Sequence, residues 1–237
     1  MSRRLPVAAA LLGCALGLAP ARAAAESPLS GSFEFRVGSY RPDVDSFFKL
    51  RAGESGPYQA IFGSGRPNAF KLHVARALPW RTAGTLEVGF GAGYWEVNGH
   101  ALDAAGAATS ERTAFKIVPT QLTLTWRLDL LWERFSVPLV PYGRASLERY
   151  NWWITGPGGG TVKTGATNGF AYGGGLGLVL DVIDPMLARE LDADSGVNHT
   201  MVTLDVSRSK VDDFGSSTSF VLSDSKLTFS VGLLFVF

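Results

Sequence analysis

Side chains that commonly carry catalytic or metal chemistry are few in this sequence. It contains three histidines, His73, His100 and His199, and one cysteine, Cys14. His73 follows Lys71 by two residues in a segment of alternating polarity, which predicts a polar residue facing the interior of a β-structure. His199 opens a similar segment and is expected to make a local hydrogen bond, whereas His100 lies in a polar connection without a recognisable partner. The serines show no spacing that would assemble a Ser-His-acid site, so no catalytic residue is predicted and the chain is not expected to be an enzyme.

Three stretches rich in glycine or aspartate resemble ligand loops only in part. Residues 192–198 begin like a calcium loop, but that pattern needs an oxygen ligand at its fifth position and Glu at its twelfth, where this chain has Gly196 and Thr203. A helix exit and a turn are expected there instead. Residues 156–160 lack the Gly-Lys-Ser/Thr ending of a phosphate loop and are expected to form an outer loop. The glycines of 173–177 are expected to make room for side chains inside a sheet. No metal and no cofactor is predicted.

The N-terminus has the pattern of a secretory signal peptide. Arg3 and Arg4 precede an uncharged apolar run from residue 5 to 18, and Ala21-Arg22-Ala23 forms a small-x-small cleavage pattern. The run is shorter than the roughly 20 residues that a transmembrane helix needs. We therefore expect residues 1–23 to be a cleaved signal, with the mature chain starting at Ala24 or Glu26.

A lipoprotein is the alternative interpretation of this segment, because Leu11-Leu12-Gly13-Cys14 resembles a lipidation site. Cleavage after Ala23 would instead remove the cysteine and three arginines, leaving 19 basic and 21 acidic residues, a net charge of −2. Such a chain has no disulfide chemistry, and its charge gives no support to a nucleic-acid partner. Residues 24–237 then form the functional domain.

The composition of that domain indicates a β-barrel in a membrane. The mean hydropathy of the whole chain is positive, yet no apolar stretch of residues 24–237 approaches the ~18 residues of a membrane helix. Only helices and closed barrels satisfy their backbone hydrogen bonds in lipid. The final segment, 226–237, alternates clearly, with Leu227, Phe229, Val231, Leu233, Phe235 and Phe237 on one face. A last strand ending in Phe is similar to the C-terminal signal of outer-membrane barrels. The edge strand of a soluble sandwich is the alternative.

Seven upstream segments alternate in the same way, at 32–38, 69–77, 85–97, 116–129, 139–152, 169–181 and 200–209. Eight strands predict an all-β, antiparallel, up-and-down transmembrane barrel. The connections at 39–68, 98–115, 153–168 and 210–225 are long and are expected to be extracellular. Connection 182–199 should contain a short periplasmic helix, because Asp184-Pro185 has the pattern of an N-cap followed by Pro and Gly196 stands beyond its end.

The predicted interior carries charges of both signs. The inward positions are Glu34, Arg36, Lys71, Glu87, Arg127, Asp129, Arg144, Glu148 and Asp205. An eight-stranded barrel is just wide enough for side chains to fill it, so these residues predict a closed, ion-paired lumen. Arg127 is expected to pair with Asp129 or Glu148, and Arg144 with Glu148 or Asp205. Aromatic girdles at the membrane interfaces are expected from Trp80, Trp95, Trp126, Trp132, Trp152 and Trp153.

Several motifs resemble those of a known family. They are YRPDVD at 40–45, PY at 57–58 with FG at 62–63, VPLVPY at 137–142, DP at 184–185 with ARELD at 188–192, GVNHT at 196–200 and VDDFG at 211–215. On these the chain resembles a family of small, uncharacterised outer-membrane β-barrel proteins of myxobacteria, over nearly all of residues 24–237. The resemblance implies the barrel and its location. It supplies no activity and no functional residue, because that family has no assigned function.

Two classes of function remain open. The first is a structural or surface-interaction barrel in the outer membrane, whose extracellular loops contact outer-membrane lipid, lipopolysaccharide or external ligands. The alternative is a narrow conduit or binding barrel for small or hydrophobic solutes. In either case the expected partners include periplasmic chaperones and the barrel-assembly machinery, the latter through the strand that ends at Phe237. No nucleic-acid partner is expected.

Overall fold

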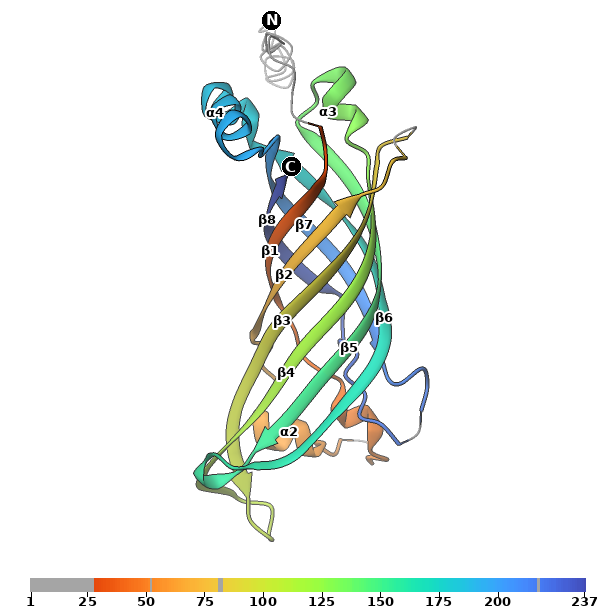
Figure 1. Ribbon diagram of the computed structural model, residues 1–237. Helices are drawn as coiled ribbons and strands as arrows, with labels where there is room; N and C mark the ends of the chain where they lie inside the picture. The colour runs from red at the N-terminus through yellow and green to blue at the C-terminus, as the bar shows by residue number, and fades with distance from the viewer. Residues whose placement is uncertain (1–27, 52, 81–82, 217) are drawn as a thin grey trace, which may run out of the picture.

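Eight antiparallel strands close into one barrel in chain order (Figure 1). The structure, a computed structural model, describes residues 28–51, 53–80, 83–216 and 218–237. The strands are β1 (Gly31–Ser39), β2 (Asn68–Ala77), β3 (Thr85–Leu102), β4 (Ala108–Arg127), β5 (Leu139–Thr155), β6 (Thr161–Val179), β7 (His199–Val211) and β8 (Thr228–Val236). This confirms the predicted fold. The predicted signal peptide and Cys14 lie outside the described residues. None of the helices in the described part is long and apolar enough to cross a membrane.

The barrel closes where the first strand meets the last. Ser32 to Gly38 of β1 pair with Val236 to Ser230 of β8 in antiparallel register. Phe237 extends this seam, because its backbone N–H donates to the carbonyl of Gly31 at 2.9 Å and its carbonyl accepts from the N–H of Gly31 at 3.2 Å. The sheet therefore has no free edge, as a sheet in hydrocarbon requires.

An apolar belt surrounds the barrel. Its members are large outward side chains that remain exposed in the isolated chain, among them Phe35, Phe70, Leu72, Val88, Phe90, Leu122, Leu124, Leu147, Phe170, Leu176, Leu204, Phe229 and Val231. Exposed apolar surface of this extent needs a nonaqueous partner. Arranged around a closed barrel it is the surface that faces lipid, so the barrel is a transmembrane one.

The walls of the barrel are unequal in height. β1 and β8 have 9 residues each, whereas β3, β4, β5 and β6 have 17 to 20. All four long strands extend toward the same end, opposite to the chain end Phe237 (Figure 1). We call this the outer end, and the end that holds Phe237 the inner end.

The long strands correct two predicted connections. Most of 98–115 and 153–168 is strand, and the turns are only 103–107 and 156–160. Beyond the apolar belt the two faces exchange polarity: Glu96 and Asn98 point outward, while Trp95 and Val97 are buried inside. A search for strands with apolar residues outside and polar residues inside therefore does not recognise the strand segments beyond the belt.

Helices occupy the connections at both ends. The predicted helix at the inner end is confirmed as α4 (Pro185–Ser195), where the Asp184 carboxylate accepts from the N–H groups of Met186 and Leu187 at 3.1 and 3.0 Å. Gly196 ends it with a left-handed backbone, φ 71°. Other short helical turns were not predicted: α3 (Leu130–Phe135) and η3 (Leu180–Val182) at the inner end, and η1 (Val44–Phe47), α2 (Pro57–Phe62) and η2 (Pro157–Gly159) at the outer end.

The glycine run of β6 makes room in the lumen, as predicted. A Cβ at Gly175 would lie 2.1 Å from the Leu204 carbonyl oxygen and 2.6 Å from the hydroxyl of Tyr142. Both distances are below van der Waals contact, so the backbone of β7 and the ring of Tyr142 hold this position to glycine. Gly143, which faces outward on β5, has open space instead: a Cβ there would meet no atom within 4 Å.

We expect Gly175→Ala to lower the free energy of unfolding by about 1–3 kcal/mol, the usual cost of overpacking a filled interior. The matched control, Gly143→Ala, should leave it unchanged within measurement error. Urea unfolding of the refolded proteins, followed by the slower gel mobility of the unfolded form, measures both. Equal midpoints for the two variants would contradict the close packing of Gly175.

Candidate functional site: a closed interior beneath an aromatic cap

The interior is filled in layers, beginning with an apolar plug at the inner end. Val140, Val179, Met201, Leu234 and Val236 are all buried and in contact. Leu29 and Trp132 pack against this cluster. Apolar side chains thus close the inner mouth of the barrel.

A charged layer lies next to the plug. Arg127 of β4 makes two parallel hydrogen bonds to the Glu87 carboxylate, at 2.8 and 2.9 Å, and the Ser32 hydroxyl donates to the same carboxylate at 2.9 Å. Thr85 donates to Asp129. Glu87 is about 99% buried, so its charge depends on these partners, because an unpaired buried charge is costly.

A second ion-paired group crosses the barrel. Arg144 of β5 donates to Glu34 of β1 at 2.7 Å, and the Thr203 hydroxyl donates to the other Glu34 oxygen at 3.0 Å. Arg36 lies 3.5 Å from both Glu34 and Asp205. Side chains from β1, β5 and β7 therefore meet in the middle of the lumen and leave no open channel at this level.

The structure confirms that the predicted charged residues point inward but corrects their partners. Arg127 pairs with Glu87 instead of Asp129 or Glu148, and Arg144 pairs with Glu34. The physical reason is register. Glu87 projects from the neighbouring strand onto the same inward face as Arg127, and Glu34 is brought opposite Arg144 only by closure of the barrel.

A small polar cavity separates the charged layers from the outer end. It has a volume of about 40 Å³ and is lined by Arg36, Lys71, Glu148, Tyr150 and hydroxyl groups of β7 and β8. Since one water needs roughly 10–15 Å³ of such space, the cavity suits a few water molecules and is too small for a solute. The second oxygen of Glu148 is buried and meets no hydrogen-bond geometry with the described residues, which is consistent with a hydrated space.

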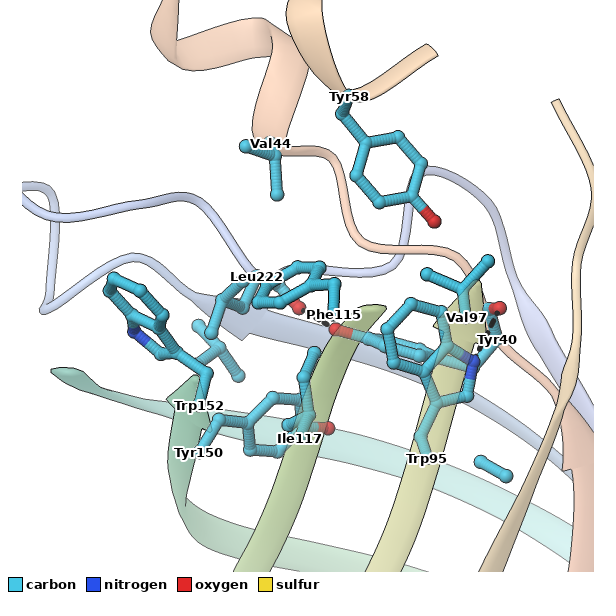
Figure 2. Packing of buried hydrophobic residues seen from close by; sticks show 12 residues of the cluster. Tyr40, Val44, Tyr58, Trp95, Val97, Phe115, Ile117, Tyr150, Trp152 and Leu222 are labelled. Carbon is cyan, nitrogen blue, oxygen red and sulfur yellow. Dashed lines mark hydrogen bonds between the residues drawn. The ribbon is translucent and has the colours of Figure 1, made fainter. Parts of the chain in front are cut away.

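An aromatic cap closes the outer mouth (Figure 2). It is the cluster of Tyr40, Val44, Tyr58, Ala69, Trp95, Val97, Phe115, Ile117, Tyr150, Trp152, Val211 and Leu222, with Phe62, Ile154 and Phe220 packed against it. Its rings meet mainly edge to face, as for Trp95 with Tyr40 at 5.4 Å and with Phe115 at 5.9 Å between centroids. Such pairs add to the stabilisation from burial.

Polar contacts fasten the outer connections onto the cap. The Tyr40 hydroxyl donates to the Leu222 carbonyl, and the Trp95 indole N–H donates to the Tyr40 carbonyl at 3.2 Å. Asp45 accepts from the backbone N–H groups of Tyr58 and Gln59 at 2.8 and 3.0 Å, which caps the start of α2. The β1–β2 and β7–β8 connections are thus tied both to the strands and to themselves.

A third fastening joins these two connections directly. Arg66 donates to Asp224 at 2.7 Å, and the Thr228 hydroxyl donates to the same carboxylate.

Burial raises the pKa of Tyr58 above its usual value, although Arg41 nearby opposes the shift. The pKa of Tyr40 is likewise raised by burial and by the Asp224 carboxylate, so both hydroxyls remain neutral hydrogen-bonding groups at physiological pH.

The sequence pattern predicts interface girdles from the tryptophans and does not predict the cap. That assignment is wrong for Trp95 and Trp152, which are buried in the cap, and for Trp132, which packs on the inner plug. Trp80 and Trp126 are exposed on the outside of the barrel, as a girdle requires. The signal was present in the parity of the strands, because Trp95 and Trp152 fall on inward positions.

The remaining candidates have ordinary structural roles. His73 is buried in the lumen beside the Thr123 hydroxyl, and His199 makes the expected local contact, with its Nδ1 2.7 Å from Asp181. His100 is exposed near the outer end of β3. Residues 192–198 form the end of α4 and a turn, and no group of acidic, histidine or cysteine side chains suited to a metal occurs among the described residues.

Comparison with known proteins finds similarity in the barrel alone. No family model matches the chain, and no curated protein matches it. Among solved structures, Neisserial surface protein A is 9% identical with a TM-score of 0.46, over 90% of this chain and all of that one. Ail of Yersinia pestis is 14% identical with a TM-score of 0.42, over 90% and 100%. The N-terminal barrel of Pseudomonas aeruginosa OprF is 12% identical with a TM-score of 0.41, over 88% and 99%.

The geometry predicts that removing one partner of the Arg127–Glu87 ion pair lowers the free energy of unfolding more than replacing both partners. Arg127→Met should lower the free energy of unfolding by about 3–5 kcal/mol, because it leaves a buried carboxylate unpaired. Adding Glu87→Gln should restore part of that loss. The control Arg112→Ala, at an exposed position of β4, should have almost no effect. Urea midpoints in one detergent test all three, and a double variant that is weaker than Arg127→Met would contradict the pairing.

Proposed function

We propose that this protein is a closed outer-membrane barrel that serves as a rigid support for an external contact surface and catalyses no reaction. The aromatic cap is the observation that carries the proposal. It fixes the β1–β2 and β7–β8 connections onto the long strands, so the outer end has a fixed shape. Side chains of these connections that face away from the cap form the external contact surface.

The exposed part of this surface mixes apolar and basic groups. Phe48 and Leu50 are partly exposed, and Lys49 and Arg51 stand beside them. A surface of this kind suits amphipathic, anionic partners such as lipopolysaccharide or other outer-membrane lipid. The contact surface is accordingly assigned to the outer end rather than to the lumen.

A conduit for small or hydrophobic solutes is the alternative function. It would require the inner plug, the charged layers and the cap to move together, because each fills the lumen on its own. The cavity of about 40 Å³ between them is too small to hold a solute. These features favour the closed support.

Delivery to the outer membrane is part of the proposal. It is supported by the signal-like pattern of residues 1–23, by the resemblance to the myxobacterial family and by the apolar belt of a closed barrel. In this proposal periplasmic chaperones carry the chain, and the assembly machinery binds the final strand through Phe237. The cleaved protein would then span residues 24–237.

The closed lumen predicts an absence of conductance. Protein refolded into planar bilayers should give no steady current steps above the lipid background at moderate voltage, with an open porin as the recording control. Insertion is verified by the faster gel mobility of the unboiled protein. Stable single-channel steps would refute the closed support and establish the conduit.

The role of Phe237 in assembly can be separated from its role in stability. Phe237→Ala keeps the backbone hydrogen bonds to Gly31, so it should refold in detergent as well as the unaltered protein. In cells its assembled amount should fall severalfold, since the aromatic end is lost, whereas Phe237→Tyr should assemble normally. Normal cellular assembly of Phe237→Ala would contradict recognition of this side chain.

A further inference from the structure

Basic side chains lie on the lipid-facing surface just beyond the apolar belt. Arg208 and Lys210 follow Val206 on the outward face of β7, and Arg149 follows Leu147 on the outward face of β5. Only β6 separates the two strands: Arg149 pairs with Asn168 of β6, whereas Lys210 pairs with Phe170 and Arg208 with Tyr172. The backbones of Lys210 and Arg208 therefore lie roughly 12 and 17 Å from that of Arg149. Among the described residues Arg208 makes no hydrogen bond or ion pair, while Lys210 is 3.8 Å from Asp212.

The turn that follows β7 holds a strained backbone. Asp213 and Phe214 have φ values of 50° and 58°, and Gly215 follows at 92°. Positive φ is unfavourable for a bulky residue such as Phe. Strain of this kind persists only where the surroundings impose it, and it often marks a functional position.

Asp213 imposes the strain by anchoring the turn to β6. Its carboxylate accepts from the backbone N–H and the side-chain amide of Asn168 at 2.7 and 2.8 Å, and the Ser219 hydroxyl donates to it as well. Arg149 donates to the same Asn168 side chain at 3.1 Å. Partial burial raises the pKa of Asp213, but these hydrogen bonds outweigh it and hold the pKa below its usual value. The anchor is therefore ionised at neutral pH.

Phe214 is not part of the cap. Its side chain is 66% exposed, in contrast to the buried aromatic residues of the cap. The first part of the β7–β8 connection bulges away from the barrel wall before the chain returns to the cap at Leu222 (Figure 1). The strained turn thus exposes an aromatic side chain four residues after Lys210.

A largely apolar groove lies in the belt across β6, β7, β8 and β1. Its lining includes Leu176, Leu204, Val206, Phe229 and Val231, together with Val37, Gly38 and Ser39 of β1 and Asn68 of β2. Val206 is the outward residue next to Arg208 on β7, so the lining of the groove adjoins one of the basic side chains. Because the groove lies within the belt, it faces the acyl chains of the surrounding lipid.

We propose that this face binds a phosphate-bearing lipid of the surrounding leaflet. Arg208, Lys210 and Arg149 contact the phosphate oxygens, Phe214 enters the headgroup layer, and an acyl chain lies in the groove. Arginine suits this role because its planar guanidinium binds phosphate through two hydrogen bonds. An aromatic side chain at the boundary between apolar and polar layers adds a second anchor. The site goes beyond the proposed contact surface at the outer end and requires only that the barrel crosses a bilayer.

The test uses the whole processed protein in phosphatidylcholine nanodiscs to which diphosphoryl lipid A is added. Native mass spectrometry counts the lipid A molecules that remain bound after release of the disc. The unaltered protein should retain lipid A, and Arg208→Ser with Lys210→Ser should weaken retention roughly tenfold or more, given the contribution of each basic residue near an anionic surface. The matched control is Arg76→Ser, an exposed outward arginine at the inner end of β2. Equal retention by the double variant, or an equal loss in the control, would overturn the site.

A second variant separates the function of Phe214 from its structural role. Phe214→Gly relieves the positive φ, so its denaturant midpoint should not fall, yet its lipid A retention should. Retention as strong as that of the unaltered protein would remove Phe214 from the site. Inorganic phosphate at millimolar concentration distinguishes the source of the ligand: displacement of lipid A by phosphate alone would show a site for free phosphate and overturn the lipid assignment. Because retention is measured without current recording, its failure is distinguishable from failure of the closed-support proposal.

Discussion

A sheet in hydrocarbon has no water to satisfy the backbone groups of its edge strands, and the pairing of β1 with β8 removes that cost. The other features depend on this closure. Closure turns one face of every strand to lipid and the other into a narrow lumen. It also brings Glu34 of the first strand opposite Arg144 of the fifth, so that the charges of the interior are paired. A narrow barrel with charged inward positions is stable only when those charges meet.

Apolar side chains lie on opposite faces of the strands within the belt and beyond it. Within the belt, apolar side chains face outward and polar ones fill the lumen. Beyond it, where both faces would meet water, the long strands bury Trp95, Phe115 and Trp152 inside and turn Glu96 and Lys116 outward. The cap therefore behaves as the core of a small soluble domain built on the rim of a membrane barrel. Its stability comes from aromatic burial and from loop contacts such as Arg66 with Asp224.

The fold could be predicted because alternation is a local property. Leu227 to Phe237 on one face of the last strand, and the N-cap of Asp184, are readable from neighbouring residues alone. Ion-pair partners could not be predicted, since the pairing of Arg144 with Glu34 depends on closure between distant strands. The cap was not predicted, because tryptophan is generally expected at the membrane interface. Trp95 nevertheless falls on an inward position of its strand. The strained turn at Phe214 has no local sequence signal beyond Gly215, as its conformation comes from the contact of Asp213 with Asn168.

The unequal wall has a consequence for motion. Local opening of a backbone hydrogen-bond network starts in its weakest part. Here that part is the seam between β1 and β8, which have 9 residues each, whereas the strands of the β3–β4 and β5–β6 hairpins have 17 to 20 residues. Amide protons of β1 and β8 should therefore exchange with solvent deuterium sooner than those in the middle of β4 and β5. The two long hairpins therefore keep their backbone hydrogen bonds while the short seam between β1 and β8 opens and closes.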